Sequence, residues 1–244
     1  MAKEALAFIE KHKSEPFYPN YSMFSVHTPF NAKPSLIEKY RSRVNPADAQ
    51  RRPTYAAMVE SMDDTAGTLL DTLDRVKLTE RTILVFTANN GGTMYNEVDG
   101  VSPTSNRPLR GGKASVFEGG TRAPGVVILP GVTPPGSRSD ALIQSEDSYP
   151  TLLEATPLPP APGQRFDGAS ILPALKGDAL AGKAIYQFFP HDPGVADWLP
   201  PAVAVIRDDW KPIRIFHGGE KGAHRYLLFN VRDDLSEKNN LAPR

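Results

Sequence analysis

The chain has 244 residues, and its 28 basic and 28 acidic side chains give a formal net charge of zero at neutral pH. This balance gives no support for a nucleic-acid partner or an anionic membrane surface, and no apolar run reaches the length of a membrane span. The sequence has no cysteine, which excludes disulfides and thiolate metal sites. Its amino terminus has no uninterrupted apolar core, so we expect no signal peptide.

The first third of the chain predicts helices and one strand. Residues 2–13 carry apolar side chains at helical spacing. Residues 21–26 have the composition of a strand, which would deliver His27 at its end. Proline favours the first helical turn, so a helix is expected from Pro34. Residues 55–76 carry apolar side chains at intervals of three and four, which predicts a long amphipathic helix.

A buried strand is predicted at residues 82–87, and it runs directly into Ala88-Asn-Asn-Gly-Gly92, here called the asparagine loop. Polar loops after the carboxyl end of a strand lie where open α/β sheets bind ligands. A second strand is predicted at residues 125–129. A short helix is predicted at residues 148–155, with proline in its first turn.

Beyond Gly177 the pattern changes to short β-prone runs, the last two of which flank a polar turn and predict a hairpin. These runs cover residues 184–189, 202–206, 213–216 and 226–229. The acidic run at residues 233–238 is interpreted as a solvated turn. Strands that alternate with helices, followed by clustered strands, predict an α/β fold with a small antiparallel subdomain at its end.

The glycine-rich segment, residues 106–127, contains the most informative pattern. Glycine pairs at 111–112 and 119–120 stand on either side of Lys113, with Arg110 close by. Backbone without side chains can approach a bound group closely while a cation meets its charge. The pattern is therefore typical of a site that holds a tetrahedral oxyanion.

Together these segments resemble the sulfatase family, and the likeness runs through nearly the whole chain in the family's order. The matching segments are Val26-His-Thr-Pro-Phe30, the helix at 55–64, Asn89-Asn-Gly91, Leu109-Arg-Gly-Gly-Lys113 with Glu118-Gly-Gly120, Asp147–Leu153, Asp167–Pro173 and Leu228–Leu241. The resemblance implies part of an alkaline-phosphatase-like mixed sheet flanked by helices over residues 1–182. It also implies a small antiparallel carboxyl-terminal subdomain over residues 183–244.

The resemblance implies hydrolysis of a sulfate ester, with Lys113 and His27 as catalytic and substrate-binding residues. An ammonium group at Lys113 would contact a sulfate oxygen and offset charge in the transition state. His27 would protonate the departing alkoxide. Arg110 is predicted either to bind sulfate or to brace its loop on a carboxylate. His191 is predicted either to reach substrate or to be an ordinary loop histidine.

The resemblance also implies a calcium site at Asn89 and Asn90, because the family has an Asp-Asn pair there. Amide oxygens are suitable calcium ligands, but Asn89 replaces an aspartate and removes one negative charge. Calcium binding by this chain is therefore expected to be weak or absent. An ordinary Asn-Asn-Gly-Gly turn is the alternative interpretation.

The family's nucleophile motif, Cys/Ser-x-Pro-x-Arg, has no counterpart in this sequence. We therefore expect a carboxyl-terminal part of a sulfatase, inactive alone on aryl or carbohydrate sulfates and able to self-associate through unpaired strand edges. The alternatives are non-catalytic binding of a sulfated ligand and hydrolysis of phosphate or phosphonate esters. Family members are often periplasmic, secreted or lysosomal, and the sequence leaves the compartment open.

Overall fold

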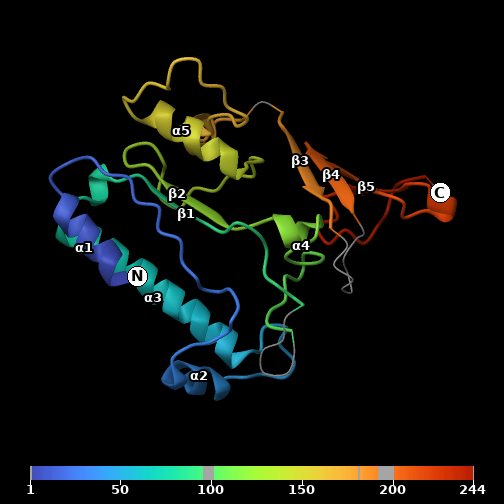
Figure 1. Cartoon of the computed structure of the whole chain (residues 1–244), viewed down its shortest axis with the longest axis horizontal. Coiled ribbons are helices and arrows are strands. Elements are labelled where there is room, and N and C mark those ends of the chain that lie inside the picture. Colours follow the sequence, from blue (N-terminus) through green and yellow to red (C-terminus); the bar gives the residue numbers. More distant parts are fainter. Residues whose placement is uncertain (1, 96–101, 181, 192–200, 244) are drawn as a thin grey trace. The chain divides into compact units, whose positions relative to one another are not determined.

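The computed structural model describes residues 2–95, 102–180, 182–191 and 201–243 (Figure 1). The chain divides into two compact units. The first unit comprises Met1–Thr82 and Thr93–Ser105, and the second comprises Ile83–Gly92 and Asn106–Arg244. The asparagine loop and the glycine-rich segment therefore belong to the second unit, whereas His27 belongs to the first.

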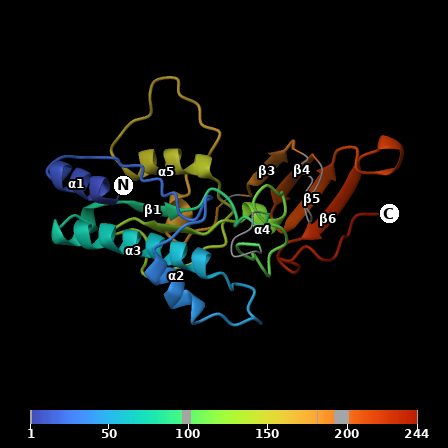
Figure 2. The ribbon, with the colours of Figure 1, turned by 60° about the horizontal axis from the view of Figure 1, so that its bottom comes forward.

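The first unit is helical, and two of its helices pack on the third. The elements are α1 (Ala2–His12), α2 (Pro34–Arg41), α3 (Pro53–Arg75) and the 3₁₀ turn η1 (Thr79–Arg81). Figure 2 shows α1 and α2 beside the long α3. Lys39 of α2 pairs with Glu60 of α3 at 2.6 Å, and Arg75 of α3 pairs with Glu10 of α1. In the described part of the chain, no helix combines the length and apolar character that a membrane span requires.

The helices predicted for the first unit are confirmed, but the strand predicted at residues 21–26 is wrong. This segment forms no strand, and the backbone N–H of His27 donates to the carbonyl of Phe24 at 2.8 Å, which closes a turn. A strand needs a neighbour to satisfy its backbone groups. Neither sheet of the described residues includes this segment. The composition of residues 21–26 predicted a strand, but composition does not show whether a neighbouring strand is present to pair with it.

The second unit contains two antiparallel sheets and short helices. In the smaller sheet, β1 (Leu84–Thr87) pairs with β2 (Gly125–Ile128), so that Thr87 is opposite Gly125. The larger sheet has the order β3-β4-β5-β6. Its strands are β3 (Ala184–Phe189), β4 (Ala202–Arg207), β5 (Trp210–Ile215) and β6 (Arg225–Asn230). The remaining elements are α4 (Glu118–Thr121), η2 (Ser145–Asp147), α5 (Ser148–Ala155), α6 (Leu172–Leu175) and η3 (Glu220–Gly222).

All the strands and helices predicted for this unit are present, and the hairpin is β5 with β6. The strand predicted as buried, now β1, instead alternates between half-buried and exposed residues. The division of the chain into domains at residue 182 stays a prediction. The larger sheet buries alternate residues, as expected for a sheet with one covered face. Its buried face packs on Val116 and Phe117 of the glycine-rich segment, and the rings of Phe117 and Phe229 lie 6.4 Å apart. The core of the second unit thus joins the carboxyl-terminal sheet directly to the predicted site.

The opposite face of the larger sheet is exposed and aromatic. Tyr186 and Phe188 of the edge strand β3 are 71% and 66% exposed, and Tyr226 of β6 is 57% exposed. Exposed edge strands and apolar faces favour association between chains. Self-association of the chain stays a prediction, and this face is one surface suited to it.

Candidate functional site

The glycine-rich segment and the asparagine loop pack against each other backbone to backbone. The amide of Gly91 donates to the carbonyl of Gly120 at 2.9 Å, and the amide of Lys113 donates to the carbonyl of Gly92 at 3.0 Å. Within the glycine-rich segment, the amide of Gly119 donates to the carbonyl of Arg110 at 2.7 Å. These bonds connect Lys113 to the loop that contains Asn89 and Asn90.

The glycines are required because the backbones leave no room for a side chain. A Cβ atom on Gly91 would lie 1.8 Å from the carbonyl oxygen of Gly119. A Cβ on Gly119 would lie 2.3 Å from the carbonyl oxygen of Gly111, and one on Gly120 would lie 2.2 Å from that of Ser115. Backbone atoms cannot rotate out of the way as a flexible side chain can. The glycine pairs are therefore explained first by the close approach of three backbone segments.

Asn106 fastens the same loops, and the sequence analysis assigned it no role. Its Oδ1 accepts from the amide of Gly92 at 2.9 Å. Its Nδ2 donates to the carbonyls of Gly92 at 2.9 Å and Gly111 at 3.1 Å. A side-chain amide can donate and accept at once, which suits it to cross-linking two loops. The only signal in the sequence was its position at the start of the glycine-rich segment.

The predicted residues of the second unit differ in exposure and contacts. Lys113 and Asn90 are half-buried, and Asn89 is exposed. The Nδ2 of Asn90 donates to the carbonyl of Gly91 at 2.8 Å. His191 follows β3, and its ring lies 5.2 Å from the ring of Phe189 in an edge-on arrangement.

Arg110 braces the glycine-rich segment. Its guanidinium lies over the ring of Phe117 at 3.9 Å, and Nη1 donates to the backbone carbonyl of Glu237 at 3.0 Å. This is the bracing alternative of the sequence analysis, except that the acceptor is a carbonyl rather than a carboxylate. Direct sulfate binding by Arg110 stays a prediction.

His27 follows a turn in the first unit, where its side chain is exposed. Its Nδ1 lies 2.9 Å from the carbonyl oxygen of Thr28. A carbonyl can only accept, so Nδ1 carries a proton in this contact. The meeting of His27 with the second unit's residues stays a prediction.

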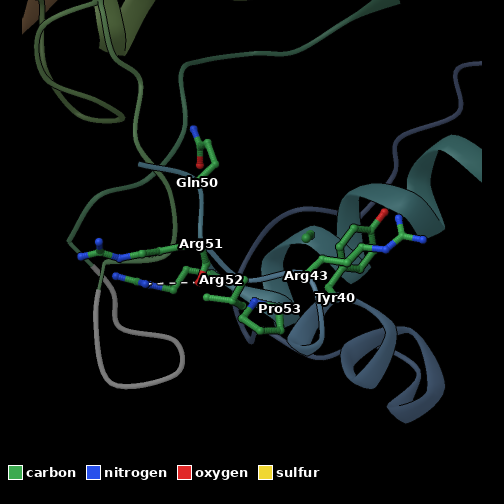
Figure 3. A pocket seen from close by; sticks show the side chains of 8 residues that line it. Tyr40, Arg43, Gln50, Arg51, Arg52 and Pro53 are labelled. Atoms are coloured by element: carbon green, nitrogen blue, oxygen red, sulfur yellow. Dashed lines mark hydrogen bonds between the residues drawn. The ribbon is translucent and has the colours of Figure 1, made fainter. Parts of the chain in front are cut away.

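A small pocket of about 60 Å³ lies in the first unit and does not include any predicted site residue. Figure 3 shows Arg51 and Arg52 extending together from the segment before α3. The guanidinium carbon of Arg43 lies 5.9 Å from the ring centre of Tyr40. The Nε of Arg52 donates to the carbonyl of Ser102 at 2.9 Å. These arginines pack the start of α3, and the pocket is too small for a sulfated sugar.

The glycine-rich segment is anchored by a buried ionic cluster formed by Glu118, Lys211 and Glu237, each at most 1% exposed. The Nζ of Lys211 lies 2.8 Å from Glu118 Oε1 and 2.9 Å from Glu237 Oε1. Arg122 pairs with the second oxygen of Glu118 at 2.6 Å. The interpretation of residues 233–238 as a solvated turn is therefore wrong at Glu237. Its carboxylate is buried because distant residues supply its partners.

The two carboxylates of the cluster titrate in opposite directions. Burial opposes ionisation of Glu118, but Lys211 and Arg122 outweigh it and hold its pKa below 4.5. At Glu237 burial outweighs the attraction of Lys211, and the pKa is raised above 4.5. The charged form is therefore favoured at Glu118 and disfavoured at Glu237.

This difference predicts the pH dependence of stability. The stability contributed by ionised Glu118 is present above 4.5 and is lost as pH falls through its lowered pKa. Ionisation of Glu237 costs stability, which decreases as pH rises from 4.5 through its raised pKa. We expect Glu237→Gln to reduce the decrease in the free energy of unfolding above pH 4.5. The loss of stability at lower pH, which depends on Glu118, should remain. Urea unfolding at several pH values measures this, and an unchanged slope above 4.5 would contradict it.

The residues of the asparagine loop do not by themselves fit a calcium ion. Calcium takes about six to eight oxygen ligands, usually with several carboxylates. Asn89 and Asn90 offer two neutral amide oxygens, and the described residues contain no group of three or more acidic or histidine side chains that could hold a metal. The chain's own donors therefore support no chemical step through calcium.

We expect calcium to bind the chain weakly, with a dissociation constant in the millimolar range or above, near the weak limit of natural calcium sites. Asn89→Asp should bind more tightly because it restores one carboxylate, whereas Asn239→Asp, on an exposed residue, serves as the matched control. Isothermal titration calorimetry measures both. Tight binding by the unaltered chain would show that other carboxylates contribute.

Comparison with known proteins gives a consistent result. The family model described as Sulfatase matches residues 1–158. A sulfatase from Formosa agariphila is 30% identical over 240 residues, which cover 93% of this chain and 42% of the relative. Human arylsulfatase H is 33% identical over 198 residues, which cover 80% of this chain and 33% of the relative. The chain thus spans about a third to two fifths of the length of these relatives.

A solved structure, Ps i-CgsB in complex with k-i-k-neocarrahexaose, superposes with a TM-score of 0.81 and 27% identity. The match covers 98% of this chain and 49% of that structure. These findings confirm the predicted α/β fold of the alkaline-phosphatase-like class. At the level of the family, they support sulfate ester hydrolysis. Because the Sulfatase family model matches more than half of this chain's residues, the chain belongs to the sulfatase family.

Proposed function

We propose that the second unit of this chain provides the sulfate-binding part of a sulfuric ester hydrolase site, with Lys113 as the principal contact. The observation that carries the proposal is the hydrogen bond from the Lys113 amide to Gly92, at 3.0 Å. Together with the glycine packing, this bond connects the backbone of Lys113 to the loop that contains Asn89 and Asn90. A cation on a backbone that packs without side chains is suited to a sulfate group, because the group can approach closely while the cation meets its charge.

The proposed roles follow from the chemistry of each side chain. The ammonium of Lys113 would stabilise charge on the sulfate oxygens as the ester bond breaks, since a fixed cation in a half-buried place needs no reorganisation. As the imidazolium, His27 would donate its Nε2 proton to the departing alkoxide and would remain as the neutral ring whose Nδ1–H bonds to the carbonyl of Thr28. His191 would contact the alcohol part of the substrate from the end of β3.

A carbohydrate sulfate is the proposed substrate class, supported by the likeness to a sulfatase structure that holds a carrageenan hexasaccharide. A second candidate is binding of a sulfated ligand without turnover. It is favoured by the absence of cysteine and of Ser-x-Pro-x-Arg from the sequence. The experiment below separates these candidates.

The test is a titration of the ¹⁵N-labelled chain with sodium sulfate, followed by NMR. Sulfate should shift the amides of residues 111–113 and 89–92. Lys113→Met should weaken binding about tenfold or more, since a hydrogen bond to a charged group contributes about 1.5–3 kcal/mol. The exposed Lys176 provides the matched control, Lys176→Met, which should bind as the unaltered chain does.

Sulfate binding that is equal in Lys113→Met and the unaltered chain would contradict the proposal. Preference for inorganic phosphate would favour the phosphate ester alternative. Incubation with 4-nitrophenyl sulfate is the second arm. Binding without turnover supports the non-catalytic candidate for the isolated chain, whereas turnover that disappears in Lys113→Met supports a complete hydrolase and a nucleophile outside the family motif.

A further inference from the structure

We infer that Lys211 and Glu237 are positioning residues for the Lys113 site, because they fix the start of α4 and thereby the loops that present Lys113. The inference rests on the proposed function for the importance of Lys113, but its structural part stands on contacts alone. Both residues lie far from the glycine-rich segment in the sequence. Neither resembles a substrate-binding residue in its local pattern.

The first step is the attachment of Glu118, the first residue of α4. Its backbone amide donates to Glu237 Oε2 at 2.7 Å. Its side chain accepts from the Nζ of Lys211 at 2.8 Å. Glu118 is thus held at both its backbone and its carboxylate, by one residue from β5 and one from the carboxyl-terminal segment. These two contacts together fix the position of Glu118 relative to β5 and the carboxyl-terminal segment.

The second step is the connection from Glu118 to the loops. Gly119 follows directly, and its amide bonds to Arg110; Gly120 accepts from the amide of Gly91. Carbonyl oxygens lie so close to these glycines that a single Cβ would collide with them. A displacement of α4 must therefore move the asparagine loop and the segment that leads to Lys113. Close-packed backbone transmits such a shift because it has no spare volume.

A third contact reinforces the same connection from the other side. The backbone carbonyl of Glu237 accepts from Arg110 at 3.0 Å. Glu237 therefore binds the glycine-rich segment on both sides of Lys113, through its carboxylate at Glu118 and through its carbonyl at Arg110. Its φ is 51°, in the left-handed region that is unfavourable for a residue with a side chain. Glu237 adopts this unfavourable conformation and makes both contacts with the glycine-rich segment.

The chemistry of the cluster is also that of a positioning device. Three ionisable side chains at most 1% exposed are costly to desolvate in their charged forms, and apolar residues of similar size often give equal or greater stability. An ionic cluster supplies direction as well as attraction, because hydrogen-bond geometry defines one arrangement. We therefore assign the cluster to the exact placement of α4 and its glycines.

The test uses Glu237→Gln, with Asp147→Asn as the matched control. Asp147 is 1% exposed and pairs with Lys183 at 2.5 Å in the same unit, and its carboxylate also accepts from the amides of Gln144 and Ala169, all outside the glycine-rich segment. Both changes replace one buried carboxylate by its amide. NMR-detected hydrogen exchange follows the amides of Gly91, Lys113 and Gly119, and circular dichroism establishes that each variant is folded.

We expect Glu237→Gln to increase exchange at these amides at least tenfold and to weaken sulfate binding by a similar factor. Asp147→Asn should increase exchange only around its own partners, including the amides of Gln144 and Ala169, and leave sulfate affinity unchanged. Glu237→Asp, which keeps the charge but withdraws the carboxylate, should fall between Glu237→Gln and the unaltered chain.

Unchanged loop exchange in folded Glu237→Gln would overturn the inference. So would loss of the fold in both Glu237 variants, because the cluster would then maintain the whole unit rather than the loops. Failure of the proposed function has a different signature. In that case Lys113→Met leaves sulfate binding unchanged, while Glu237→Gln still increases exchange at the amides of Gly91 and Gly119.

Discussion

Replacing Lys211 with methionine should lower the free energy of unfolding by about 3–5 kcal/mol, the usual cost of removing one partner from a buried ion pair. Lys211 is 0% exposed and lies within 2.9 Å of both Glu118 and Glu237. Without the ammonium, two buried carboxylates would face each other with only Arg122 to balance them. Urea unfolding at neutral pH, followed by circular dichroism, measures this loss.

Two further variants define the cause. Lys238→Met, on the exposed lysine next to Glu237, should change stability by less than about 0.5 kcal/mol, as surface substitutions usually do. Adding Glu118→Gln and Glu237→Gln to Lys211→Met should recover part of the loss, because the uncompensated charges are then gone. Equal stability of Lys211→Met and the unaltered chain would show that the cluster is not a tight ionic contact in solution.

Gly91→Ala should be the most damaging single-methyl change in the asparagine loop. Its Cβ would lie 1.8 Å from the carbonyl oxygen of Gly119, and it would meet backbone rather than a side chain. Overpacking costs about 1–3 kcal/mol in most cores, and we expect the upper end or more here. The loops must separate to admit the methyl group, so the hydrogen bond to Gly120 and the sulfate-dependent shifts of residues 111–113 should also be lost.

Gly67→Ala is the matched control, since Gly67 lies inside α3 and a Cβ there meets nothing within 4 Å. Alanine is a better helix former than glycine by about 1 kcal/mol, so this variant should be more stable than the unaltered chain. Opposite signs for the same Gly→Ala change are expected in thermal or urea unfolding. A Gly91→Ala chain as stable as Gly67→Ala would refute the close packing of the loops.

The two predictions concern one connected structure. Lys211 stabilises Glu118 by an ion pair, whereas Gly91 allows close packing on Gly119 and Gly120 because it has no side chain. Both effects act on the first three residues of α4, which are Glu118, Gly119 and Gly120. The carboxyl-terminal sheet is therefore structurally part of the proposed site, although none of its strands has a sequence pattern that indicates chemistry.

Elements with a strong local pattern could be predicted from the sequence. Helix α5 begins and ends at the predicted residues, with Pro150 in its first turn, and β3 matches its prediction from Ala184 to Phe189. The position of Lys113 between glycine pairs identified the loop that bonds to Gly92. These features depend on neighbours a few residues apart, so the sequence by itself determined them.

Other features were decided only by the tertiary structure. A strand at residues 21–26 required a partner strand, but neither sheet of the described residues includes this segment, and a turn formed instead. Glu237 looked like a solvated turn residue, yet it is buried because Lys211 and the amide of Glu118 meet it. Charge, backbone donors and excluded volume act between atoms that lie close in space. Residues separated by as many as 119 positions contribute those atoms, and no local pattern of the sequence predicts these contacts.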